Sequence, residues 1–252
     1  MAYKLSCDLH THTVYSCGIK GPHAKGTIEE NAREAHRKGL KLLGISEHGP
    51  GHKFYGMDMK KLPQMRSDIE EAKRIFPELD IRLSVEANII NPSGNLDVKK
   101  EDIPLFDYII AGYHYGVLGE EPLKAVKVCL GGYWHNYGGR TSEGAKNYNT
   151  DLVLKALYSN PIKVLTHPGD KAAFDLDAIS KACEETGTLM EISNHHAELS
   201  VSAIKIAAKY DVSFIISSDA HVPQNVGTFD KALARAEEAG LDLERIVNLC
   251  KL

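Results

Sequence analysis

The side chains with the clearest chemical potential are histidines and carboxylates in short polar segments. The chain has 12 histidines against a single tryptophan. His10 and His12 are separated by one residue, as are Asp219 and His221. In an extended chain, residues i and i+2 project to the same side, so both members of such a pair can bind one metal ion. Imidazole and carboxylate ligands without thiolate suit a catalytic Zn²⁺, Mn²⁺ or Fe²⁺ site better than a structural zinc site.

These residues form a site only if the fold gathers them. Short apolar runs alternate with stretches of helical period, which predicts repeated βα units around a parallel sheet. The seven expected strands are Tyr3–Asp8, Lys41–Ile45, Ile81–Glu86, Tyr108–Tyr113, Val164–Thr166, Leu189–Ile192 and Ser213–Ser217. The expected helices are one that begins at a Thr27–Glu30 capping box and ends before Gly39, then Leu62–Ile75, Asp151–Tyr158, Asp175–Glu185, Leu199–Lys209, Phe229–Ala239 and Leu241–Leu249.

Every expected strand is followed or ended by a residue of a metal-ligand type. These residues are His10, His12, Glu47, His48, Glu86, His114, His167, Glu191, Asp219 and His221. Because the carboxyl ends of the strands form the functional face of a βα barrel, we expect these side chains to converge on one site. His36, His52 and His135 are instead interpreted as ordinary surface or hydrogen-bonded histidines.

Further residues are candidates for supporting roles around such a site. Glu47, Glu191 and Asn194 are placed to orient ligand imidazoles or bound water. His195 and His196, beside the sixth strand, are candidates for gripping a substrate or protonating a leaving alkoxide, against the alternative that they are simple loop residues.

Composition narrows the class of protein. The formal net charge of −4 and the pI of about 6.3 give the whole molecule no electrostatic footprint for a polyanion such as nucleic acid. Five scattered cysteines form neither a disulfide framework nor a CxxC site, which is typical of reduced cytosolic thiols. No apolar run approaches the roughly 18 residues of a membrane span. We therefore expect a cytoplasmic protein without membrane partners, and the sequence does not indicate its oligomeric state.

Six segments in order resemble the PHP (polymerase and histidinol phosphatase) family, specifically its stand-alone YcdX-like phosphatase branch. They are DLHTHT at Asp8–Thr13, ISEHGP at Ile45–Pro50, VEANI at Val85–Ile89, IIAGYH at Ile109–His114, LTHPGD at Leu165–Asp170 and SSDAH at Ser217–His221. The likeness spans nearly the whole chain. It implies an α/β fold, a distorted seven-stranded (βα)7 TIM-like barrel, with residues 1–252 forming a single domain.

The resemblance also implies three divalent metal ions, with Zn first and Mn or Fe as alternatives. Their ligands would be His10, His12, Glu86 and Asp219 for the first ion, Glu86, His114 and His167 for the second, and His23, His48 and His221 for the third. The assignment of His23 rests only on the helix that follows it, because the loop from Thr13 to Pro22 looks longer than in the family. A third ion depends on that assignment.

The segment Gly131–Arg140 looks like an insertion relative to the family. Its glycine and aromatic content suits a mobile lid, and Arg140 could hold a substrate phosphate with two hydrogen bonds. The alternative is a surface loop with no part in catalysis.

The expected reaction is hydrolysis of small phosphate monoesters by attack of a metal-bound hydroxide, with Glu86, Asp219, His195 and Arg140 as the catalytic residues. The first alternative is histidinol-phosphate phosphatase, and the second is a metal-dependent nuclease or repair module. A barrel amidohydrolase would not explain Glu86, His23 and His48 as ligands. A metal-binding protein without catalytic activity also stays open.

Overall fold

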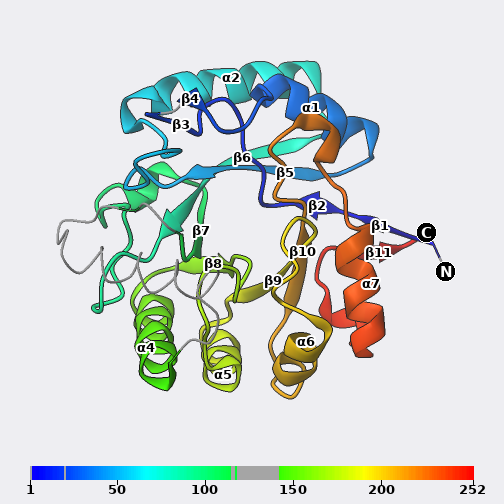
Figure 1. Cartoon of the computed structure of the whole chain (residues 1–252). Coiled ribbons are helices and arrows are strands. Elements are labelled where there is room, and N and C mark those ends of the chain that lie inside the picture. The colour runs from blue at the N-terminus through cyan, green and yellow to red at the C-terminus, as the bar shows by residue number, and fades with distance from the viewer. Residues whose placement is uncertain (1, 20, 115–116, 118–141) are drawn as a thin grey trace.

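A parallel sheet that curves into a nearly closed barrel organises the molecule (Figure 1). The computed structural model describes residues 2–19, 21–114, 117 and 142–252. The barrel strands are β2 (Cys7–Asp8), β5 (Leu42–His48), β6 (Asp80–Asn88), β7 (Tyr108–Gly112), β8 (Ile162–Leu165), β9 (Leu189–Ser193) and β10 (Phe214–Ser217). They are hydrogen-bonded in the order β10-β9-β8-β7-β6-β5-β2, and every pair is parallel. The predicted seven-stranded α/β barrel is confirmed.

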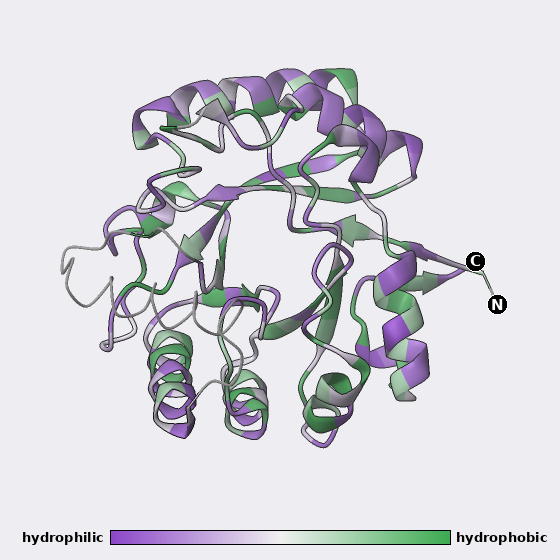
Figure 2. Ribbon diagram, viewed as in Figure 1, coloured by the Kyte–Doolittle hydropathy of each residue, from purple (hydrophilic) through white to green (hydrophobic). Residues whose placement is uncertain are grey.

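Helices cover the outside of this barrel. They are α1 (Ile28–Arg37), α2 (Leu62–Ile75), α4 (Glu143–Ser159), α5 (Leu176–Thr186), α6 (Val201–Ala207) and α7 (Asp230–Ala239). Short 3-10 turns are η1 (Met59–Lys61), η2 (Ile103–Leu105), η3 (Pro223–Asn225) and η4 (Leu243–Arg245). The predicted capping box is present, because the Thr27 hydroxyl accepts from the Glu30 amide while the Glu30 carboxylate accepts from the Thr27 amide. Figure 2 shows hydrophobic residues along the barrel strands and hydrophilic ones along α1 and α2. No helix in the described ranges is both long and apolar enough to cross a membrane.

A small apolar cluster lies on the inner face of the sheet. Ile110 is in register with Glu86, and Ile215 with Glu191, so these side chains project to the same face. Ile110 and Ile215 pack with Leu9 and Val164. The polar residues at the strand ends therefore stand above an apolar floor, which limits the access of water to them from below.

Side chains complete the barrel where its first and last strands meet. Across this seam, Thr11 and Ala220 form an isolated parallel β-bridge. The Asn248 amide nitrogen donates to the carbonyl oxygens of Cys7 at 2.8 Å and Ile216 at 2.7 Å. Its amide oxygen accepts from the Ile216 amide at 3.1 Å. Asn248 therefore links β2 to β10 in place of a backbone ladder.

Replacing Asn248 by alanine should destabilise the fold by about 2–4 kcal/mol, because it removes three hydrogen bonds at a buried seam and leaves backbone groups unpaired. Chemical denaturation of the protein would measure this change. Val247→Ala is the control, since the Val247 side chain is 54% exposed and its truncation should cost far less. Equal stability of the two variants would contradict a role of Asn248 in closing the barrel.

Two predicted elements differ at the termini. The strand expected at Tyr3–Asp8 is divided between β1 (Tyr3–Leu5) and β2, and β1 pairs antiparallel with β11 (Leu249–Lys251) outside the barrel. The helix expected at Leu241–Leu249 is wrong, because the chain there forms η4 and then enters β11. Pairing with a strand at the opposite end of the chain outweighs the local helical pattern.

One helix boundary also differs by more than a turn. Helix α4 begins at Glu143, well before the expected start at Asp151, because the Ser142 hydroxyl caps it by accepting from the Ala145 amide.

Candidate metal centre

The carboxyl ends of the strands bring the predicted ligands into one buried cluster. His48 is the last residue of β5, Glu86 lies near the end of β6, and the others follow their strands directly or within a few residues. The cluster consists of His10, His12, His48, Glu86, His114, His167 and Asp219, each 9% exposed or less, and of His221, whose side chain is 22% exposed. Ligand atoms from these residues approach closely enough to share metal ions in four overlapping groups of three.

Glu86 occupies the centre of the cluster. Its Oε1 lies 2.8 Å from His167 Nε2 and 3.3 Å from His114 Nε2. Its Oε2 lies 2.9 Å from His48 Nδ1 and 3.4 Å from His10 Nε2. Because the two oxygens contact different sets of imidazoles, one carboxylate can serve two neighbouring ions.

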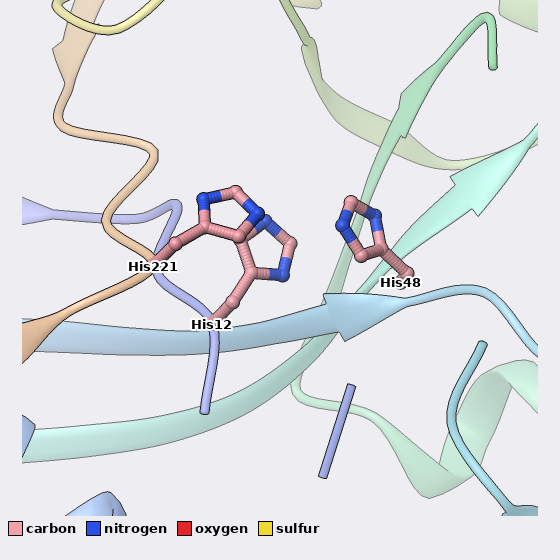
Figure 3. Close-up of side chains that lie close together, drawn as sticks. All are labelled: His12, His48 and His221. Atoms are coloured by element: carbon pink, nitrogen blue, oxygen red, sulfur yellow. The ribbon is translucent and has the colours of Figure 1, made fainter. Parts of the chain in front are cut away.

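A second part of the cluster is formed by histidines alone. Figure 3 shows the rings of His12 and His221 side by side, with the ring of His48 facing them. The ring centroid of His12 is 4.2 Å from that of His48 and 4.5 Å from that of His221. His23 lies at the edge of this group, 4.6 Å from the His221 ring, and stacks on Tyr55 at 3.9 Å. His23 is exposed, so the structure brings it beside the other three without enclosing it.

Several buried ligand atoms have no hydrogen-bond partner in the described structure. They are both ring nitrogens of His48, His114 Nδ1, His221 Nε2 and Glu86 Oε2. Leaving a buried polar atom unpaired costs about 1–3 kcal/mol, so a folded protein rarely gathers several in one place without a use for them. A divalent cation would satisfy the carboxylate oxygen and one nitrogen of each imidazole, and the residues therefore fit a metal centre.

The electrostatics of the cluster favour a bound cation. Burial raises the pKa of Glu86, but His114 and His10 outweigh burial and hold that pKa well below its usual range. Burial and the neighbouring His48 lower the pKa of His12 far below its usual value, so this imidazole is neutral and can bind metal. His10 differs, because the charges of Glu86 and nearby carboxylates outweigh burial and raise its pKa. A metal cation would take the place of that proton.

Carboxylates behind the cluster orient the imidazoles of His10 and His12. Glu191 Oε1 lies 2.8 Å from His10 Nδ1, which directs His10 Nε2 into the cluster. Glu47 accepts from the Ser16 hydroxyl at 2.5 Å, and that hydroxyl lies 3.4 Å from His12 Nδ1. Both arrangements place the ring N–H away from the site and leave Nε2 as the ligand atom.

Asn194 has a different role from the one expected. Its side-chain oxygen accepts from the Lys231 and Ala232 amides, and its nitrogen donates to Thr228 Oγ1. The described contacts of Asn194 therefore stabilise the start of α7 and do not orient a ligand imidazole.

We expect Glu191→Gln to lower zinc affinity by about 10- to 100-fold, the usual range for a group that orients a metal ligand. Glu191 accepts from both the His10 ring and the His167 amide, and a glutamine would turn a donor toward one of them. Competition with a chromophoric chelator measures the affinity. An unchanged affinity would mean that Glu191 does not orient His10.

The remaining predicted residues fall into three groups. His195 is exposed at the rim, its ring centroid 5.9 Å from that of His221, whereas His196 is partly buried. His36 is exposed on α1, as expected. Arg140, His135 and the expected lid at Gly131–Arg140 lie outside the described residues.

Two features of the site were not anticipated. His52, which sequence reasoning set aside, is buried with its ring centroid 5.7 Å from that of His48, and burial lowers its pKa to about 3. Asp170 is 4% exposed and lies next to His196. Asp170 lies in the same segment as His167, and this position is the sequence feature that could have identified it.

Known proteins that resemble this chain agree with the family that its sequence segments indicate. The PHP domain family model matches residues 8–246. A protein named probable phosphatase from Thermoanaerobacter sp. (strain X514) is 30% identical over 97% of this chain and 91% of its own length. A probable phosphatase from Clostridium acetobutylicum is also 30% identical over the same shares. The crystal structure of histidinol phosphate phosphatase from Lactococcus lactis, complexed with zinc, L-histidinol and phosphate, covers 94% of both chains with a TM-score of 0.60. Its sequence identity is 14%, so it supports the fold alone.

Proposed function

This chain belongs to the PHP domain family, and on that premise we propose that it is a metal-dependent phosphatase that hydrolyses small phosphate monoesters. The observation that carries the proposal is the set of buried, unpaired ligand atoms around Glu86. The reaction class comes from the relatives, which are named probable phosphatases and match this chain over nearly their whole length.

The proposed ligand sets divide the residues of the cluster among three ions, as the resemblance to the family implies. The geometric groups cut across these sets, since His12 rather than His23 lies with His48 and His221. One ion would be held by His10, His12, Glu86 and Asp219, a second by Glu86, His114 and His167, and a third by His23, His48 and His221. When bound, divalent ions of this kind supply Lewis acidity toward phosphoryl oxygens and an activated water. Zinc is the first choice because nitrogen ligands dominate, with manganese or iron as alternatives.

The protein's own groups then position the reaction. Glu86 and Asp219 place two negative charges among the histidines, which offset part of the positive charge of the ions that the cluster would hold. The apolar cluster of Ile110, Val164 and Ile215 below it restricts water to the open face. His195, exposed at the rim, is proposed to contact the substrate or its leaving group.

Histidinol phosphate is the second candidate substrate. The Lactococcus lactis structure of the same fold is a histidinol phosphate phosphatase in complex with zinc, L-histidinol and phosphate. Both candidates are monoesters, so the same site chemistry serves either one.

The test is release of inorganic phosphate from p-nitrophenyl phosphate, sugar phosphates, nucleotides and histidinol phosphate by protein loaded with Zn²⁺ or Mn²⁺. Asp219→Asn is the matched control, since it keeps the size of a buried ligand and removes its charge. Release that depends on both metal and Asp219 supports the proposal, and the ranking of esters identifies the substrate class. Cleavage of single-stranded DNA without phosphate release from any monoester would overturn it in favour of a nuclease.

A further inference from the structure

His196 lies between two carboxylates, and one of them belongs to the proposed metal centre. Its Nδ1 is 3.3 Å from Asp170 Oδ1, and its Nε2 is 3.2 Å from Asp219 Oδ2. The other oxygen of Asp219, Oδ1, faces the cluster at 3.2 Å from His12 Nε2 and 3.5 Å from His10 Nε2. The two oxygens of Asp219 therefore have separate partners.

The turn that carries His196 is itself held firmly. The amides of His195 and His196 donate to the Ser193 hydroxyl at 3.2 and 3.1 Å. From α7, Arg235 donates to the carbonyl oxygen of His196 at 3.0 Å and to that of Ser193. The His196 imidazole therefore extends from a turn that hydrogen bonds hold at both ends.

Asp170 is fixed in the same way. Its amide donates to the His167 carbonyl at 3.1 Å, and the Lys171 ammonium contacts its Oδ2. The His196 ring also lies 4.7 Å from the His167 ring. Asp170 and His196 together therefore connect the ends of β8, β9 and β10.

The two ligands that this pair contacts have unusual backbones. His167 has a φ of 27° and Asp219 a φ of 50°, which are uncommon for residues other than glycine. Such conformations persist only where the surroundings hold them in place. The neighbouring Asp170 and His196 are part of those surroundings.

We propose that Asp170 and His196 are a positioning pair, which holds Asp219 Oδ2 away from the metal centre and so aims Oδ1 at the ions. The inference rests on the proposed function, because it assigns a role within the same centre. It implies that the pair acts as one unit on metal affinity and on kcat, with little effect on KM.

The same residues allow a competing interpretation. Asp170, His196 and Glu198 could together hold a further metal ion. However, Glu198 Oε2 is 3.9 Å from His196 Nδ1, its side chain is 41% exposed, and Asp170 is already paired with the Lys171 ammonium. These contacts favour a bridge between carboxylates, and Glu198 provides the control that separates the two interpretations.

The experiment compares variants that keep one contact of His196 and lose the other. A glutamine amide nitrogen can stand at the position of Nε2 and keep the contact with Asp219, whereas an asparagine nitrogen replaces Nδ1 and keeps only that with Asp170. We expect His196→Asn and Asp170→Asn to weaken zinc binding and kcat about 10- to 100-fold, His196→Gln to have a smaller effect, and Glu198→Gln to have none. The double variant D170N/H196N should bind zinc no more weakly, and have no lower kcat, than His196→Asn alone.

Zinc affinity is measured by competition with a chromophoric chelator, together with zinc content per chain and the melting temperature of the metal-free proteins. Equal losses of zinc affinity in His196→Asn and His196→Gln would contradict the proposed pair, as would additive losses in the double variant. One zinc fewer per chain in Glu198→Gln would favour the competing metal site. A wild-type protein that binds zinc but cleaves no ester would refute the proposed function, while the affinity comparison would still test the pair.

Discussion

Glu86→Gln is expected to reduce kcat/KM by about 1000-fold or more. The carboxylate contacts five imidazoles through its two oxygens, and Thr166 Oγ1 donates to Oε1 at 2.9 Å. Glutamine keeps the shape but removes the charge and turns an NH₂ group toward the imidazole nitrogens of the proposed metal centre. If Glu86 is the bridging ligand that we propose, its loss should remove several kcal/mol of transition-state stabilisation, and about 4 kcal/mol corresponds to about 1000-fold.

Steady-state kinetics on the best ester, with metal content measured on the same sample, checks this expectation. Glu78→Gln is the matched control, because Glu78 is exposed and the same chemical change there should leave kcat/KM unaltered. If Glu86→Gln kept both its metal and more than a tenth of the wild-type activity, Glu86 could not be the shared ligand of two ions.

The barrel and most of the cluster could be predicted because their signals are local. Apolar runs mark the strands, and the residue after each run marks the end where side chains converge. His10, Glu86, His114 and His167 all lie within such segments, and the structure brings them together. The direction of the parallel strands does the rest, because it sends all their carboxyl ends to one face.

Features that depend on distant pairing could not be read in the same way. Strand β11 forms only because β1, at the other end of the chain, offers a partner, so its local pattern suggested a helix. Asn194 carries the residue type of an orienting group but caps α7, a role visible only once that helix is placed. The Asp170 and His196 pair joins the segments after β8 and β9, which no spacing in the sequence connects.

The second large effect should follow from removing the metal. A chelator is expected to abolish phosphatase activity and to lower the melting temperature, and readdition of Zn²⁺ should restore both. Each ion bound only by the native state adds about 2.7 kcal/mol of stability at a free concentration of about 100 Kd, or about 5–10 °C in Tm for a chain of this size. Calorimetry with and without chelator, at a fixed protein concentration, measures the shift.

The variants His36→Ala and His48→Ala separate metal loss from general damage. His36 is exposed on α1, so His36→Ala should respond to the chelator as the wild type does. His48 is buried, and its Nδ1 lies 2.9 Å from Glu86 Oε2, so His48→Ala also removes contacts that the metal-free protein makes. Metal-free His48→Ala should therefore melt below the metal-free wild type, and the further rise in its melting temperature on addition of Zn²⁺ should be smaller than that of the wild type. A Tm of the wild type that does not respond to chelator or zinc would mean that these nitrogen atoms are not metal ligands.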